Sequence, residues 1–327
     1  MRPLLALSLL LLAACDTQEG TVPTPTASPS NSAQLTCRLP VWWSENIPSP
    51  PSVQDHAAFV SVPDGAVSTV APLPDQQLQY GVTYLSASKR WIRADRKHIS
   101  PDGTRYAYTT QAQANYEVHV VDIATGADRV IYSGPTLFIV IAFESDAIYV
   151  VHGVRPRQGS FENLYRLDPA GGEPTLVTGS NRHMYQYAWV LVSDGAAWGI
   201  DVRIDGNVDN YSILRLDLAT SQVTQWGESS PNDMFWPLGT DSKHRLYAGD
   251  SQQLLRLSSP GQIDRLPNPG PIGQAGNVGG PSGLVSDSRG VWFPGRGSVW
   301  LYTESQPPKQ FTVGAPTETV FPAGPCL

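Results

Sequence analysis

The 327-residue sequence has little charge, and the charge it has is not clustered. Charged residues make up 16 % of the chain, the formal net charge is −7, and no five consecutive residues carry the same sign. Nucleic-acid binding needs grouped Lys and Arg side chains that displace counterions from phosphates, so nucleic acid is not an expected partner. The lack of a charged block also excludes a basic or acidic interaction tail.

Motifs of catalysis and metal binding are scarce as well. The nucleophile elbow G-x-S-x-G and the zinc motif H-E-x-x-H are absent, and the six histidines are dispersed rather than paired at ligand spacing. The sequence therefore predicts no catalytic residue, no cofactor and no metal site of paired histidines. One alternative stays open, because a fold that gathers distant segments can assemble a metal or lyase site from several of them.

Long hydrophobic runs are missing, with one exception at the N-terminus. Residues 4–14 are apolar except for Ser8, and these eleven residues are too few for a membrane span, which needs about twenty. The run follows Arg2 and ends in small residues, which is typical of a secretory signal peptide.

The tetrapeptide Leu12-Ala13-Ala14-Cys15 at the end of this run resembles the lipobox of bacterial lipoproteins. The resemblance implies that residues 1–14 are a signal peptide, that cleavage precedes Cys15, and that its thiol carries the lipid. Ordinary signal cleavage, which would leave a free thiol, is the alternative. We therefore expect an extracytoplasmic protein, anchored by lipid to the bacterial membrane at the cell surface or on the periplasmic side.

Residues 15–36 contain no aromatic side chain and are rich in Thr, Ser and Pro. Such a segment buries too little apolar surface to offset its ordering entropy, so we expect a disordered linker. The folded domain is then residues 37–327. Cys37 and Cys326 lie at its two ends, and outside the cytoplasm two such cysteines most simply form a disulfide. Two unrelated buried thiols are the alternative.

A repeat of about 46 residues fills this domain. Glycine and proline number 29 each, as expected for a fold with many turns. Turn-forming tetrapeptides recur with aspartates spaced 44, 48, 47 and 46 residues apart, at Asp102, Asp146, Asp194, Asp241 and Asp287. An aspartate in such a turn accepts hydrogen bonds from backbone amides near its own position.

Each turn is followed by two short apolar runs whose positions recur in register. The second run places Val118, Leu164, Ile213, Leu254 and Val299 at one position and Val121, Leu167, Leu216, Leu257 and Tyr302 at another. Four short strands per unit are typical of a β-propeller blade. Five blades are predicted at residues 80–134, 137–179, 187–229, 234–268 and 276–314. Residues 37–74 supply a degenerate sixth, with an irregular Pro-rich first half.

The unit HISPDGTRYAYTT…YEVHVVDIATGADRVIYSG, in residues 98–134, resembles the TolB-like and WD40-like propeller repeat of bacterial periplasmic and surface proteins. The resemblance implies an all-β, six-bladed β-propeller of four-stranded antiparallel blades. It covers the fold and does not supply a function.

Aromatic residues near the predicted inner strands are the candidates for a ligand site. Trp189 and Trp236 each lie five residues before a turn aspartate, and Tyr187 and Phe235 adjoin them. Together they could line a pocket at the channel mouth, although aromatic rings on inner strands also serve to pack blades together.

Oxygen-bearing side chains gather in residues 201–212, where Asp201, Asp205 and Asp209 surround Gly206. Calcium takes such ligands, but their order differs from an EF-hand loop, so a solvated hairpin loop is the favoured interpretation.

These features predict a monomeric, lipid-anchored, non-catalytic module that binds an unidentified protein, glycan or other ligand. Two alternatives stay open: a propeller enzyme of lyase or sugar-processing type with its site in the central channel, and a structural spacer.

Overall fold

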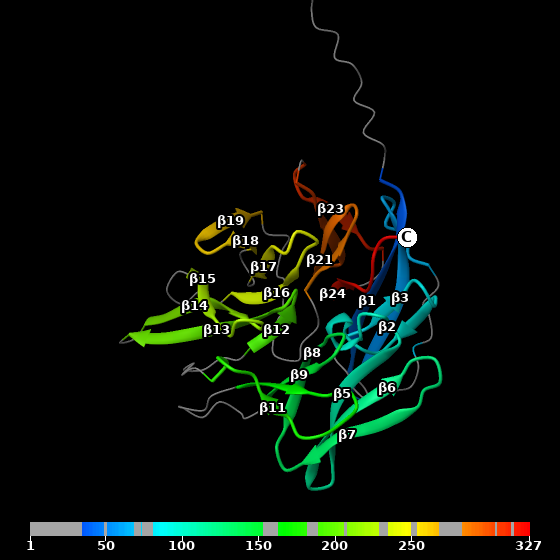
Figure 1. Ribbon diagram of the computed structural model, residues 1–327. Helices are drawn as coiled ribbons and strands as arrows, with labels where there is room; N and C mark the ends of the chain where they lie inside the picture. The colour runs from blue at the N-terminus through cyan, green and yellow to red at the C-terminus, as the bar shows by residue number, and fades with distance from the viewer. Residues whose placement is uncertain are drawn as a thin grey trace, which may run out of the picture. The chain divides into compact units, whose positions relative to one another are not determined.

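The computed structural model describes residues 35–48, 51–68, 73, 81–152, 163–181, 189–205, 208–228, 235–249, 254–267, 283–304, 306–314 and 317–327. One compact unit spans Leu35–Leu327, and its regular structure is almost entirely β-strand (Figure 1). The single helix within these ranges is the 3-10 turn η1 (Arg96–His98). No helix in the described ranges is long and apolar enough to cross a membrane.

Three four-stranded antiparallel sheets follow one another along the described chain, each built from consecutive strands. The first contains β8 (Phe138–Phe143), β9 (Ile148–His152), β10 (Leu164–Leu167) and β11 (Thr175–Leu176). The second contains β12 (Trp189–Ser193), β13 (Ala196–Asp205), β14 (Val208–Asp217) and β15 (Val223–Glu228). The third contains β16 (Trp236–Thr240), β17 (Leu246–Gly249), β18 (Leu254–Ser259) and β19 (Gln262–Leu266). In each, the first strand lies nearest the middle of the unit (Figure 1).

Shorter or shared sheets surround these three. A hairpin of β3 (Thr83–Leu85) and β4 (Arg90–Ile92) precedes η1. The next sheet contains β5 (Arg105–Ala112), β6 (Asn115–Asp122) and β7 (Asp128–Gly134), and a single bridge joins Ile99 to Tyr106 on β5. The last repeat supplies β20 (Val285–Asp287), β21 (Gly290–Arg296), β22 (Ser298–Tyr302) and β23 (Lys309–Thr312).

The predicted repeat is confirmed by the positions of its turns and core residues. Asp146, Asp194 and Asp241 lie between the first and second strands of their sheets, and Asp287 ends the first strand of the last repeat. All ten apolar positions predicted to be in register have exposed fractions of 6 % or less. The two positions of a strand are three residues apart and so lie on opposite faces of the sheet, and both faces pack against neighbouring sheets: Leu164 and Leu167 belong to different apolar clusters.

Consecutive sheets pack face to face through apolar clusters. One cluster joins Val118 of β6 to Val140 of β8 and Val150 of β9. Another joins Val151 of β9 to Trp189 of β12 and other residues of that sheet. Sheets that pack in chain order around a common middle form a multi-blade β-propeller, as the sequence predicts.

The two ends of the domain meet at a disulfide. Cys37 and Cys326 are bonded, with their Cα atoms 5.7 Å apart across 289 residues of sequence. The last strand, β24 (Thr319–Pro322), pairs with β1 (Cys37–Pro48) on one side and with β21 on the other. The Arg38 and Leu327 backbones exchange two hydrogen bonds of 3.1 and 3.0 Å beside the disulfide. The predicted adjacency of the ends and their cross-link are confirmed.

The first segment of the domain is more regular than expected. Despite its prolines, β1 is a twelve-residue strand that pairs along its whole length with β2 (Pro51–Val62). β1 pairs with β2 along one edge over its whole length and with β24 along the other edge at Val41 and Trp42, so the middle of the strand is paired on both sides. The expectation of an irregular first half was therefore wrong. The count of six blades stays a prediction, since the end segments share one sheet and the β5–β7 sheet has three strands.

Candidate functional site

The turns between first and second strands form one candidate surface, which we call the turn face: residues 100–104, 144–147, 193–195, 240–245 and 286–290. Several of its aspartates accept hydrogen bonds from the amide two residues later, as the repeat predicts: Thr104 N to Asp102, Lys243 N to Asp241 and Arg289 N to Asp287. At Asp102 the Ser100 hydroxyl, followed by the Thr104 amide and hydroxyl, lowers the pKa of the carboxyl to about 2. These three carboxylates stabilise turns and are engaged within the fold.

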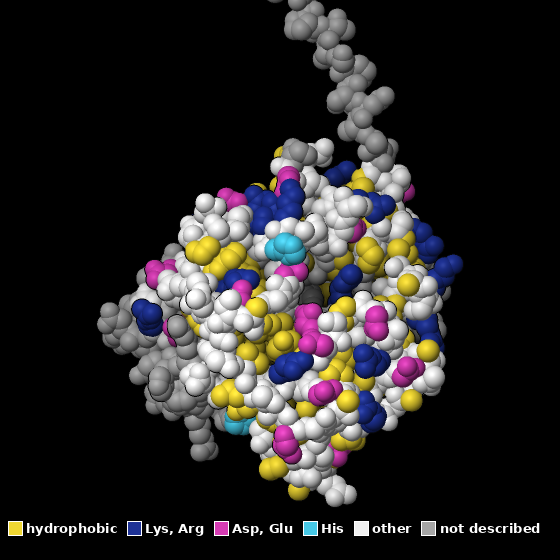
Figure 2. All heavy atoms as spheres, in the orientation of Figure 1, with side chains coloured by type: hydrophobic (Ala, Val, Ile, Leu, Met, Phe, Trp, Pro, Cys, Tyr) yellow, Lys and Arg dark blue, Asp and Glu magenta, His cyan; other side chains and the backbone are white. Residues whose placement is uncertain are grey.

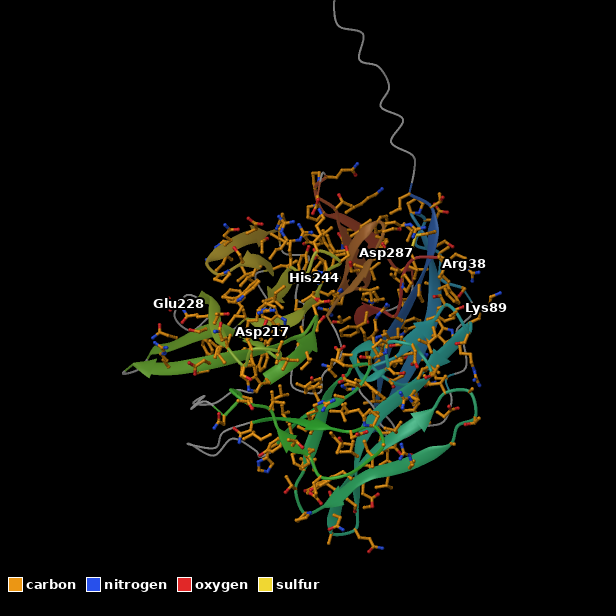
Figure 3. All side chains as sticks on the ribbon, viewed as in Figure 1. Arg38, Lys89, Asp217, Glu228, His244 and Asp287 are labelled. Atoms are coloured by element: carbon orange, nitrogen blue, oxygen red, sulfur yellow. A yellow bond between two sulfur atoms is a disulfide. The ribbon has the colours of Figure 1, made fainter. Side chains whose placement is uncertain are left out.

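Asp194 differs from them because it links two neighbouring sheets. Its carboxylate accepts a 2.8 Å hydrogen bond from Thr240 Oγ1 and lies 3.1 Å from His244 Nδ1. Burial, together with the charges of Asp194 and Asp146, raises the pKa of the partly buried Glu144 carboxyl. Figure 2 shows a hollow near the middle of the visible surface, with acidic and basic side chains beside it. His244 is labelled in Figure 3.

A cavity of about 640 Å³ opens beside the turn face, between the β3–β4 turn and the sheet of β5–β7. Residues 83–88, the turns at 99–104 and 122–124, and Pro325 form its walls. Arg90 Nη1 donates a 2.8 Å hydrogen bond to Ile123 O, which fixes one wall against the other. Its volume lies in the range of small-ligand sites, and its walls combine apolar side chains with hydroxyls and charges.

No spacing in the sequence indicates this cavity. Its walls come from the first part of the predicted blade 80–134, from two later turns of the same blade, and from Pro325 near the end of the domain. Only the closure of the domain brings Pro325 to the β3–β4 hairpin, where Tyr84 N donates to Ala323 O at 2.8 Å.

The described residues of the predicted aromatic pocket lie within the apolar packing between sheets. Trp189 is completely buried, and its indole Nε1 donates to Ser180 O at 3.2 Å. Phe235 is 3 % exposed, and Trp236 is partly buried against two apolar clusters. The structure therefore uses these three rings in packing between sheets, which is the alternative that the sequence left open. Tyr187 lies outside the described residues.

The calcium candidates lie on two paired strands rather than in a loop. Asp201 is in the middle of β13, opposite Ser212 of β14, and its carboxylate lies 3.9 Å from Arg203 Nε. Asp205 and Asp209 occupy the hairpin end, and their side chains lie outside the described set. Among the residues whose side chains are described, no group of three His, Cys, Asp or Glu could hold a metal. The expectation of a solvated loop was wrong for Asp201, because β13 and β14 each extend over ten residues.

Comparisons with known proteins agree in architecture and are distant in sequence. No protein-family model matches the chain, and no curated protein matches it. A solved structure of putative TolB from Agrobacterium tumefaciens is similar at 13 % identity and a TM-score of 0.46, over 88 % of this chain and 93 % of that one. The β-propeller domain of the Trilobed protease from Pyrococcus furiosus is similar at 12 % identity and a TM-score of 0.44, over 85 % and 84 % of the two chains.

TolB from Acinetobacter baumannii is similar at 13 % identity and a TM-score of 0.37, over 71 % of this chain. The chain spans 64 % of the length of that TolB. Identities and TM-scores this low transfer no activity to the chain, which is similar to these TolB-like β-propellers in fold alone.

Proposed function

We propose that the chain is an extracytoplasmic lipoprotein, anchored to the membrane through Cys15, whose β-propeller binds a protein or other ligand without catalysis. The signal peptide would be residues 1–14, the linker residues 15–36 and the propeller residues 37–327. The 640 Å³ cavity beside the turn face is the observation that carries the binding function. Its mixed walls suit recognition of a ligand by contact and a few polar groups.

Two further observations support the proposed location. The disulfide between Cys37 and Cys326 is of the kind that persists in oxidising compartments outside the cytoplasm. Cys15 follows a short apolar run and precedes a polar segment of 21 residues, which would hold the propeller away from the lipid surface.

Replacing Cys15 with Ser tests the anchor. We expect Cys15→Ser to move most of the protein from the membrane fraction to the soluble fraction, because the acyl chains supply the membrane affinity. The measurement is immunoblotting of fractionated cells, with incorporation of labelled palmitate as the second readout. Thr17→Ser, a change in the same segment that keeps the thiol, should stay labelled and membrane-bound. Retention of Cys15→Ser on membranes would contradict lipidation.

Closing the cavity tests the binding function. Ala87 is exposed in its wall, so Ala87→Trp should occupy the space without disturbing the core. We expect a protein or glycan from an extracytoplasmic extract to be retained by immobilised wild-type chain and reduced at least about tenfold by Ala87→Trp. Val53→Trp, at a side chain 57 % exposed on β2, is the matched control and should retain the same partner.

Two outcomes would contradict this proposal. An identical set of retained molecules on all three proteins would show that the cavity is not the binding site. Cleavage of the retained molecule by wild-type chain would show that the propeller is an enzyme.

A further inference from the structure

A second cavity, of about 240 Å³, lies between the last two sheets on the turn face. Its walls are the β16–β17 turn, the β20–β21 turn, the end of β22, and side chains of β17 and β18. A water molecule in the liquid occupies about 30 Å³, so the cavity holds the volume of about eight waters. It shares no residue with the larger cavity.

Positive charge converges on this cavity from both sheets. Lys243, Arg245 and Arg256 line it from the β16–β19 sheet, and Arg289 lines it from the β20–β21 turn. Arg245 immediately precedes β17 and Tyr247 lies in it, and both side chains donate to Asp241 Oδ2, so they lie on the same side of the sheet. Arg256 is the cross-strand neighbour of Tyr247 in the same register, which places both guanidinium groups on the same side.

The two aspartates in the walls are engaged by fixed donors. Asp241, with a side chain 3 % exposed, accepts from the Lys243 and Arg245 amides and from the Arg245 guanidinium. Asp287, with a side chain 6 % exposed, accepts from Trp292 Nε1 at 2.9 Å and Cys326 N at 3.0 Å. Both carboxylates hold the walls together through these donors.

The remaining acidic group lies at the rim. Glu304 is about half exposed and pairs with Lys243 Nζ at 2.7 Å and Arg245 Nη1 at 2.6 Å. Arg256 pairs with Asp264, an exposed residue of β19 that is not part of the cavity wall. These solvent-facing pairs are worth little individually, so an anion inside the cavity can compete with them.

We propose that this cavity is a binding site for a small oxyanion, a phosphate or a carboxylate, held by Lys243, Arg245 and Arg256. Guanidinium groups bind both anions through paired, charge-assisted hydrogen bonds. The site is independent of the larger cavity and of the proposed partner. Arg289 Nη1 donates to Cys326 O at 2.6 Å, so the bound anion would lie next to the closure of the domain.

The test uses Arg256→Gln in the full chain, with Arg166→Gln as its matched control. Arg166 in β10 occupies the repeat position that Arg256 occupies in β18: each lies one residue before a buried leucine, Leu167 or Leu257. Arg166 pairs with the exposed Asp146. Titration calorimetry at constant ionic strength uses inorganic phosphate in one arm and succinate in the other, with chloride as the inert anion.

We expect saturable binding of one of the two anions to wild type and to Arg166→Gln with dissociation constants within about twofold of each other. We expect Arg256→Gln to bind at least about tenfold more weakly, because a hydrogen bond to a charged group is worth about 1.5 kcal/mol or more. The arm that saturates identifies phosphate or carboxylate as the ligand class.

Absence of saturable binding in both arms, up to about 10 mM phosphate or succinate, would overturn the proposal. Equal binding by wild type and Arg256→Gln would overturn it too. Circular dichroism checks that each variant folds, and Lys243→Gln, at a side chain 59 % exposed in the cavity wall, provides the second variant. It should weaken binding several-fold while leaving the spectrum unchanged.

Discussion

Replacing Cys37 with Ser is expected to lower the free energy of unfolding by about 5 kcal/mol. The disulfide closes a loop of 289 residues, so in the chain-entropy model it removes a large part of the freedom of the unfolded chain. In the native state, closure without it depends on the pairing of β24 with β1, which involves Val41 with Pro322 and Trp42 with Phe321. This is the largest effect that we expect from a single substitution.

Urea unfolding of the full chain, followed by circular dichroism, measures this effect. Cys15→Ser is the matched control, because it removes the one other thiol and should leave the unfolding midpoint unchanged. Reduction of wild type should reproduce the loss seen in Cys37→Ser. A loss below about 1 kcal/mol would mean that strand pairing and the stacked rings of Trp42 and Phe321, 4.7 Å apart, hold the ends together unaided.

Lowering the pH from about 7.5 to about 4.5 is expected to destabilise the fold because the unfolded chain then gains a proton on His98 that the folded chain does not accept. This side chain is 4 % exposed in η1, and burial, followed by the charge of Lys97, lowers its pKa to about 4. The unfolded chain therefore binds a proton near pH 6.5 that the folded chain refuses until about pH 4. The stabilisation from neutral His98 is complete above pH 6.5 and is lost as the pH falls towards 4, in total about 3 kcal/mol.

The measurement is the difference in unfolding free energy between these two pH values for three proteins. Carboxylates titrate over the same range, so the His98 contribution is read as a difference between variants. Wild type and His244→Leu, a change at a side chain 71 % exposed, should lose about 3 kcal/mol more than His98→Leu. The same pH dependence in His98→Leu and wild type would show that folding does not lower the pKa of His98.

The site residues show where sequence patterns are informative and where they are not. Asp102, Asp241 and Asp287 cap their turns as predicted, because that interaction is local and follows from residue type and position. Trp189 and Trp236 share their spacing to a turn aspartate and Phe235 adjoins Trp236, and the structure buries Trp189 and Phe235. Spacing identifies a strand and its neighbour but does not say whether a ring points into a cavity or between two sheets.

The sequence by itself determined the repeating four-stranded unit and the pairing of Cys37 with Cys326. It also determined the two buried positions of each repeat, of which Val118 and Val121 are the first examples. Alternation along a strand and turn chemistry are encoded within a few residues, and only two cysteines remained to pair within the domain. Only the tertiary structure decided the regular pairing of β1, the cavity between residues 83–124 and Pro325, and the convergence of Arg245, Arg256 and Arg289. Each of these depends on how neighbouring sheets meet, and that contact joins residues far apart in the sequence through packing that no local pattern records.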